Sequence, residues 1–104
     1  MENCTTAQQA LYTYAQWHCT AFERRAVYQG RSIGTEYDVS TYTGHDSQGW
    51  PASADIGPFT KIHEAMDRAA QTVSYWDFAE VLDSATGDVL VTFYHDGEFE
   101  VAKS

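Results

Sequence analysis

The fold is decided by residues 73–102, VSYWDFAEVLDSATGDVLVTFYHDGEFEVA, in which three strand-like runs are separated by two turn signals. β-Branched and aromatic side chains are frequent in these runs, and such side chains favour strands. Residues 84–87 predict the first turn, and His95-Asp96-Gly97 predicts a three-residue hairpin with glycine in the left-handed conformation. We therefore expect a three-stranded antiparallel meander with strands at 73–83, 88–94 and 98–102.

A long helix is predicted near the N-terminus. Thr5-x-x-Gln8 and Thr6-x-x-Gln9 both fit the capping-box pattern, in which hydroxyl and amide groups satisfy free backbone N–H groups. The apolar residues that follow recur every three or four positions, and they are Ala7, Ala10, Leu11, Tyr14, His18, Ala21 and Phe22. The pattern predicts a helix over about 6–28, although its last three residues fit the start of a strand equally well.

The segment between this helix and the meander contains a strand, a loop and a second helix. Residues 36–43 alternate, with Tyr37, Val39 and Thr41 on one face, which predicts a strand. Residues 44–58 hold three of the seven glycines and both prolines, so we expect a loop without regular structure. The second helix follows an N-cap at Thr60, and its apolar stripe comprises Ile62, Ala65, Met66, Ala69 and Val73.

These elements predict a single α+β domain over residues 1–104, with the order α-β-α-β-β-β. Two helices would pack on one face of a mainly antiparallel sheet, because an amphipathic helix and a half-apolar sheet bury their apolar faces against each other. A chain of 104 residues and 11.7 kDa is long enough for one hydrophobic core.

The charge of the chain limits its partners. Six Lys and Arg residues against 15 Asp and Glu residues give a formal net charge of −9. Nucleic acids and anionic membranes both need cationic side chains, so direct binding to either is not expected. No apolar run reaches the roughly 20 residues of a membrane span. The first residues also lack the pattern of a signal peptide, which predicts a cytoplasmic protein.

The two cysteines are expected to be reduced thiols. Cys4 and Cys19 are the only cysteines in the chain. Fifteen helical residues would separate them by about 22 Å, which is far beyond the reach of a disulfide.

The lengths of the two turns determine which residues of the three predicted strands pair. This register matters because a shift of one residue would move every side chain of a strand to the other face of the sheet. The first turn pairs Leu82 with Val89, Glu80 with Val91, Phe78 with Phe93 and Trp76 with His95, and the second pairs Phe93 with Phe99 and Val91 with Val101. The predicted core face comprises Trp76, Phe78, Leu82, Val89, Val91, Phe93, Phe99 and Val101. Only Glu80 does not suit this face, and we expect it at an edge or on a bulge.

The opposite face of the meander is predicted to be acidic. It would carry Tyr75, Asp77, Asp83, Asp88, Thr92, Tyr94, Glu98 and Glu100, with Ala79, Val81 and Leu90 between them. No basic residue lies between Arg68 and Lys103. Such a face is either a solvated surface that serves solubility or a rigid surface that binds a partner. Tyrosine among carboxylates and the absence of lysine favour the second interpretation.

No catalytic residue, cofactor or metal ligand is predicted. The chain lacks a G-x-S-x-G turn, a phosphate-binding glycine motif and an HExxH motif. Three of its histidines, His45, His63 and His95, are each followed by an acid, but neighbouring residues point apart on a helix or strand. The fourth, His18, is expected to pack on the first helix. We therefore expect a protein that is not an enzyme.

In size, charge and acid placement the chain is similar to small acidic phage-encoded inhibitors of bacterial defence, the anti-CRISPR proteins. Some members of that group imitate nucleic acid by presenting carboxylates to a basic groove. The resemblance covers overall size, the charge of −9 and the acid array of residues 75–100. It implies a cytoplasmic phage protein whose partner is a basic, nucleic-acid-binding protein or complex.

The expected binding surface has Asp77, Tyr94, Glu98 and Glu100 at its centre and Tyr75, Asp83 and Asp96 at its rim. Trp50 in the 44–58 loop is a secondary contact if it is exposed, or part of the core if it folds back. In the alternative hypothesis the chain is a structural or accessory domain, for example a homodimer, that oligomerises through helix 1 and the Trp50 loop. A third hypothesis, a small enzyme with clustered histidines, would require a bound metal.

Overall fold

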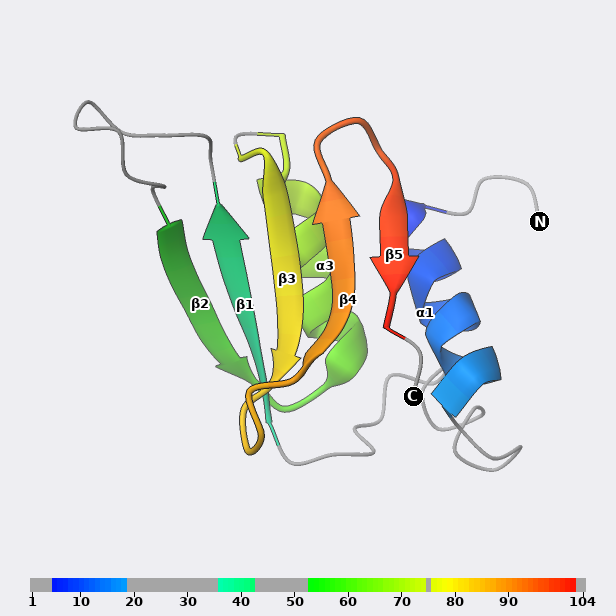
Figure 1. Ribbon diagram of the computed structural model, residues 1–104, viewed down its shortest axis with the longest axis vertical. Helices are drawn as coiled ribbons and strands as arrows, with labels where there is room; N and C mark the ends of the chain where they lie inside the picture. The colour runs from blue at the N-terminus through cyan, green and yellow to red at the C-terminus, as the bar shows by residue number, and fades with distance from the viewer. Residues whose placement is uncertain (1–4, 19–35, 43–52, 75, 103–104) are drawn as a thin grey trace.

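The computed structural model describes residues 5–18, 36–42, 53–74 and 76–102. In these residues, two helices and five strands form an α+β fold (Figure 1). The elements are α1 (Thr6–His18), β1 (Tyr37–Tyr42), β2 (Ser53–Phe59), α3 (Ile62–Thr72), β3 (Phe78–Asp83), β4 (Val89–Tyr94) and β5 (Phe99–Val101). Neighbouring strands are antiparallel in the order β2-β1-β3-β4-β5. The predicted fold class and element order are confirmed, with β2 as an additional strand.

Both helices pack on one face of the sheet. Figure 1 shows α3 behind the central strands and α1 beside β5. The buried core between the helices and the sheet comprises Ala7, Ala10, Leu11, Tyr14, Ala15, Tyr37, Val39, Ile62, Ala65, Met66, Ala69, Val73, Ala79, Val81, Val91 and Phe93. No described helix or strand packs on the other face, which we call the outer face. Within the described residues, no helix is long and apolar enough to cross a membrane.

The first capping box is confirmed atom by atom. The Thr5 N–H donates to Gln8 Oε1 over 2.9 Å, and the Gln8 N–H donates to Thr5 Oγ1 over 3.1 Å. These reciprocal bonds satisfy donors that have no partner within the helix. The predicted continuation of the helix over 19–28 lies outside the described residues, as do both cysteines.

The predicted N-cap of the second helix is wrong. The cap is Lys61 rather than Thr60, and Lys61 makes no side-chain cap hydrogen bond. Its φ of −123° and ψ of 128° continue the extended chain that leaves β2, so the helix begins one residue later, at Ile62.

The expectation that residues 44–58 contain no regular element is also wrong for the part that the structure describes. β2 pairs with β1 and forms an edge of the sheet. An edge strand tolerates proline, because one side of its backbone needs no strand partner. Gly57 has a φ of +133°, which favours glycine. Together these facts explain why a segment rich in glycine and proline still forms a strand.

A β-bulge corrects the predicted pairing of β3 with β4. The pairs are Phe78 with Tyr94, Ala79 with Phe93, Glu80 with Thr92, Val81 with Val91 and Leu82 with Val89. Only the pair of Leu82 with Val89 was predicted. Val81 and Leu82 are adjacent on β3, but their partners on β4, Val91 and Val89, are two residues apart, so Leu90 between them is the extra residue of the bulge. The predicted pairs of β4 with β5 are confirmed.

Because of the bulge, each side chain of β3 lies on the face of the sheet opposite to the one predicted. Ala79 and Val81 are buried in the core. Because side chains alternate along a strand, Phe78, Glu80 and Leu82 belong to the outer face, contrary to the prediction. The core positions predicted for Val91, Phe93, Phe99 and Val101 are confirmed.

The first strand of the meander is shorter than predicted, because it begins at Phe78 rather than at residue 73. The residues before it close the end of α3, where the Trp76 N–H donates to the Thr72 carbonyl over 3.1 Å. The predicted pairing of Trp76 with His95 is replaced by a hydrogen bond of 2.9 Å from the His95 N–H to the Asp77 carbonyl.

Candidate functional site: the acidic outer face of the sheet

One row of outer-face side chains crosses all five strands. Direct pairing brings together, in order, Asp55, Ser40, Glu80, Thr92 and Glu100. We call these five residues the acidic row. Its three carboxylates lie on alternate strands, which places them about 10 Å apart at the usual strand spacing.

A second row on the same face is aromatic. The rings of Tyr42 and Phe78 stack with centroids 4.7 Å apart and an angle of 18° between their planes. The rings of Phe78 and Tyr94 lie 6.5 Å apart at 43°. We call Tyr42, Phe78 and Tyr94 the aromatic row. Glu98 lies next to Tyr94 at one end of this row, since the Tyr94 N–H donates to the Glu98 carbonyl over 2.9 Å.

The two rows are joined by hydrogen bonds. Burial raises the pKa of the Tyr42 hydroxyl above its ordinary value of 10.0. The nearby Glu80 carboxylate raises this pKa further by its charge and by a hydrogen bond, whereas a hydrogen bond with Ser40 lowers it. The Ser40 hydroxyl also donates to Asp55 Oδ1 over 2.7 Å. These contacts fix the side chains at the centre of the outer face.

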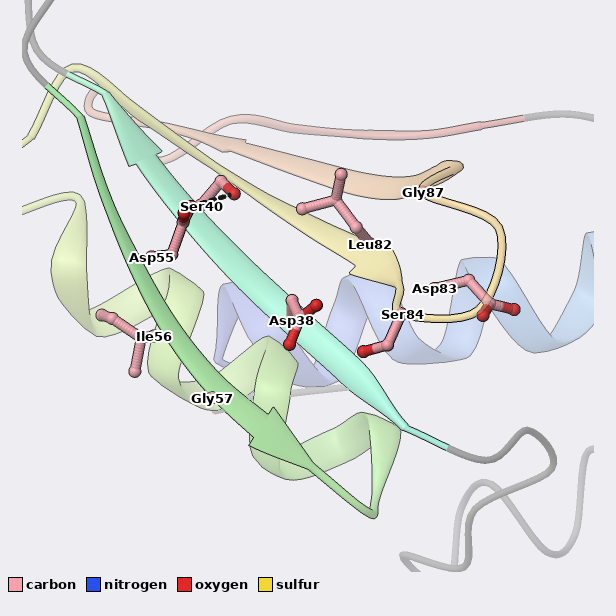
Figure 2. Close-up of a pocket in the computed structure, with 9 residues that line it drawn as sticks. All are labelled: Asp38, Ser40, Asp55, Ile56, Gly57, Leu82, Asp83, Ser84 and Gly87. Atoms are coloured by element: carbon pink, nitrogen blue, oxygen red, sulfur yellow. Dashed lines mark hydrogen bonds between the residues drawn. The ribbon is translucent and has the colours of Figure 1, made fainter.

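The outer face is hollowed between β2 and β3. A hollow of about 260 Å³ is lined by Asp38, Asp55, Gly57 and Leu82, among others, and also by Ile56, whose side chain packs against the core on the other face. Figure 2 shows Asp38, Ser40 and Leu82 on the side of the sheet that faces away from the helices. Gly57 borders this hollow.

Gly57 also allows the chain to pass close to Asp38. A Cβ atom at position 57 would lie 3.1 Å from Asp38 Oδ1 and 3.3 Å from the Tyr37 carbonyl oxygen. The part of the hollow next to Gly57 therefore depends on the close contact between β2 and β1.

No described basic side chain lies on the outer face. The described residues include only two bases, Lys61 and Arg68, and both belong to α3 or its N-cap, in the helix layer. The outer face carries Asp38, the three carboxylates of the acidic row and Glu98. The charge of the described part of the protein is therefore strongly uneven between its two layers.

The structure brings together most of the predicted centre of the site. Tyr94 on β4 lies opposite Glu98, the residue just before β5, and Glu100 on β5 lies opposite Thr92, two residues from Tyr94. Asp77 and Asp96 lie at the same end of the sheet, since the Asp77 carbonyl accepts from His95 and Asp96 Oδ1 accepts from the Glu98 N–H over 3.0 Å.

Other predicted residues do not belong to this group. Asp83 lies at the opposite end of β3, where it pairs with buried Tyr37 and its Oδ1 accepts from the Ala85 N–H over 2.8 Å. Tyr75 and Trp50 lie outside the described residues.

Sequence reasoning missed the half of the outer face that lies on β1, β2 and β3. The residues concerned are Asp38, Ser40, Tyr42, Asp55, Phe78 and Glu80. Two signals pointed to them: the alternation of residues 36–43 puts Asp38 and Tyr42 opposite the apolar face, and Glu80 did not suit the predicted core. Nothing pointed to Asp55, because its strand was not expected.

The described histidines do not form a metal site. Across the described ranges, no group of three or more His, Cys, Asp or Glu side chains is arranged to hold a metal ion. His95 Nδ1 donates to the Val73 carbonyl and so joins the β4–β5 turn to the end of α3. The buried Nδ1 of His63, on α3, has no hydrogen-bond partner among the residues that the structure describes.

No protein-family model matches the chain, and no curated protein sequence or solved structure is detectably similar to it.

Proposed function

We propose that this protein is a non-enzymatic inhibitor that binds a basic protein surface and blocks the access of nucleic acid to it, as anti-CRISPR proteins do. It would act in the cytoplasm, where its partner handles nucleic acid. The observation that carries the proposal is the acidic row, which crosses the whole sheet beside exposed tyrosine without any described basic side chain on that face.

The sheet presents these carboxylates in a fixed arrangement. Strand pairing holds Asp55, Glu80 and Glu100 in one line, and hydrogen bonds orient Asp55 and Glu80 further. A groove that binds phosphates with Lys and Arg offers the same cations to carboxylates. Because Asp55 and Glu80 are already ordered, these two side chains lose little freedom when they meet the partner.

The face is also electrostatically unfavourable when the protein is alone. The carboxylates of the acidic row lie on alternate strands, about 10 Å apart at the usual strand spacing, and with no cation between them their like charges repel one another and reduce stability. A basic partner removes this repulsion when it binds, so association gains both from new ion pairs and from relief of the old repulsion. The same argument predicts that salt weakens binding.

The hollow offers a place for one cationic side chain of the partner. The apolar side chain of Leu82 beside it suits the aliphatic stem of a lysine or arginine. The carboxylates of Asp38 and Asp55 at the same hollow suit the charged head.

A different observation favours the alternative function, an oligomerising accessory domain. On α1, Tyr12 is 44% exposed and Trp17 is 54% exposed. Exposed aromatic side chains are common in protein interfaces. In this case, sedimentation would show a mass that rises with protein concentration and does not fall when salt is added.

The test of the proposed function compares two double variants with the same change in charge. Glu98→Lys/Glu100→Lys alters the outer face, whereas Glu64→Lys/Asp67→Lys alters exposed residues of α3. Each variant, and the wild type, is used to capture proteins from a bacterial lysate at low and high salt, with identification by mass spectrometry. We expect the wild type and the α3 variant to retain the same nucleic-acid-binding protein at low salt only, and the outer-face variant to lose it. Equal retention by both variants would contradict the proposal.

A further inference from the structure

We infer that the aromatic row makes the outer face selective for arginine over lysine in its basic partner. The inference rests on the proposed function and adds to it the chemistry of the partner. The occupant to which it commits is a protein surface or segment rich in exposed arginine. Charge complementarity points to this occupant, because the outer face carries five carboxylates and no described base.

The Tyr94 ring provides a stacking surface among carboxylates. It is 37% exposed and is the last ring of the aromatic row, next to Phe78. On the other side, Glu98, the residue just before β5, lies opposite Tyr94. Glu100 lies opposite Thr92, one outer-face position along β4 from Tyr94. At the usual spacings, about 5 Å between strands and about 7 Å along a strand, both carboxylates are within reach of a cation placed on this ring.

The other two rings hold Tyr94 in place. Phe78 packs between Tyr94 and Tyr42, and the stacked pair of Phe78 and Tyr42 is half-buried. Tyr42 is in turn held by its hydrogen bond with Glu80. A ring supported in this way loses little freedom when a cation stacks on it.

Arginine and lysine differ in their fit to this arrangement. A guanidinium group is planar, stacks on aromatic rings and donates two parallel hydrogen bonds to a carboxylate. A lysine ammonium group is a compact point charge that holds its water more strongly. Carboxylates alone attract both arginine and lysine. A preference for arginine that is lost when the Tyr94 ring is removed therefore identifies the role of the aromatic row.

The test measures the affinity of fluorescein-labelled octa-arginine and octa-lysine peptides by fluorescence anisotropy at low salt. Four proteins are compared: the wild type, Tyr94→Leu, Tyr94→Phe and Glu100→Gln. Tyr94→Leu removes the ring, Tyr94→Phe keeps it without the hydroxyl, and Glu100→Gln removes a charge and keeps every ring. Thermal unfolding of each variant shows that it is folded.

We expect the wild type to bind octa-arginine about two- to fivefold more tightly than octa-lysine, the range of one exposed cation–π contact. Tyr94→Phe should keep this ratio, Tyr94→Leu should bring it close to one, and Glu100→Gln should weaken both peptides while octa-arginine still binds more tightly, because every ring is kept. Equal affinities in the wild type, or an unchanged ratio in Tyr94→Leu, would overturn the inference and leave the proposed function standing. If neither peptide binds, the proposed function itself fails, and the inference fails with it.

A second copy of the chain is the competing occupant of this face. If the outer face bound another copy, the wild type would sediment as a dimer at low salt, and octa-arginine would have to displace that copy to bind. Such a dimer, lost in Tyr94→Leu, would overturn the choice of partner.

Discussion

The ring of Phe78 stacks on the ring of Tyr42 across two neighbouring strands, with 4.7 Å between the centroids. Phe78 also contacts Tyr94 on its other side, so it connects β1, β3 and β4 on the outer face of the sheet. This face holds both the candidate binding surface and a part of the packing that stabilises the sheet.

Replacing Phe78 should therefore reduce stability although the residue is not in the buried core. We expect Phe78→Ala to lower the free energy of unfolding by about 1–3 kcal/mol, less than in a fully buried position. Phe78→Leu keeps apolar area and loses only the stacking, so it should cost less, about 0.5–1.5 kcal/mol. Urea unfolding with an unchanged m-value measures both. A Phe78→Ala variant as stable as the wild type would show that the aromatic row does not support the sheet.

Tyr42 should make the stability of the protein sensitive to alkaline pH. Its pKa is raised in the folded state by burial and then by Glu80, so the folded protein keeps this proton at a pH where the unfolded chain has lost it. The resulting stabilisation is complete below the ordinary pKa of 10.0 and disappears as the pH rises through the folded-state pKa. Tyr42→Phe should lose less stability than the wild type between pH 9 and 11, measured by urea unfolding at each pH. Identical pH profiles would contradict this assignment.

Gly57 should tolerate substitution less well than Gly87. Both have a positive φ, +133° and +78°, so alanine strains the backbone at either position. At Gly57 a Cβ atom also meets Asp38 Oδ1 and the Tyr37 carbonyl, whereas at Gly87 no atom of the described part of the chain lies within 4 Å. We expect Gly87→Ala to cost about 1 kcal/mol and Gly57→Ala about 2–4 kcal/mol. The difference in thermal midpoint between the two variants checks the expectation, and equal midpoints would argue against the close approach of β2 to β1.

A lysine at position 92 should raise the stability of the protein and weaken its binding to a basic partner. Thr92 lies directly between Glu80 and Glu100 in the acidic row. Thr92→Lys should be more stable than the uncharged control Thr92→Gln by about 0.2–1 kcal/mol for each carboxylate that it pairs with. The gain should shrink at high salt. The same variant should bind a basic partner less well than the control, and a stabilised variant with unchanged binding would contradict the proposed role of the acidic row.

Much of the fold could be predicted because local patterns determine it. Thr5 and Gln8 form the predicted capping box, and Gly97 has the left-handed φ of +91° expected in the hairpin. The apolar periodicity of the second helix and the alternation of residues 36–43 also gave the correct buried faces. In each case the residues that carry the signal are close together in the chain, so no knowledge of tertiary contacts is needed.

The remainder depended on features that have no local signature. Leu90 is an extra residue in an otherwise apolar run, so the sequence does not show where the bulge lies. The bulge decides whether Phe78 and Glu80, or Ala79 and Val81, enter the core. An acid on a predicted core face was the one indication that the register was wrong. Asp55 could not be placed because pairing with β1, not local propensity, makes residues 53–59 a strand.

The central claim is that the acidic outer face occupies a surface to which nucleic acid otherwise binds. The most direct test titrates the protein into a complex of its captured partner with fluorescently labelled nucleic acid and follows the anisotropy of the label. We predict that the wild type and Glu64→Lys/Asp67→Lys release the nucleic acid in proportion to the partner they occupy, and that Glu98→Lys/Glu100→Lys does not. Formation of a ternary complex that retains the nucleic acid would contradict the account.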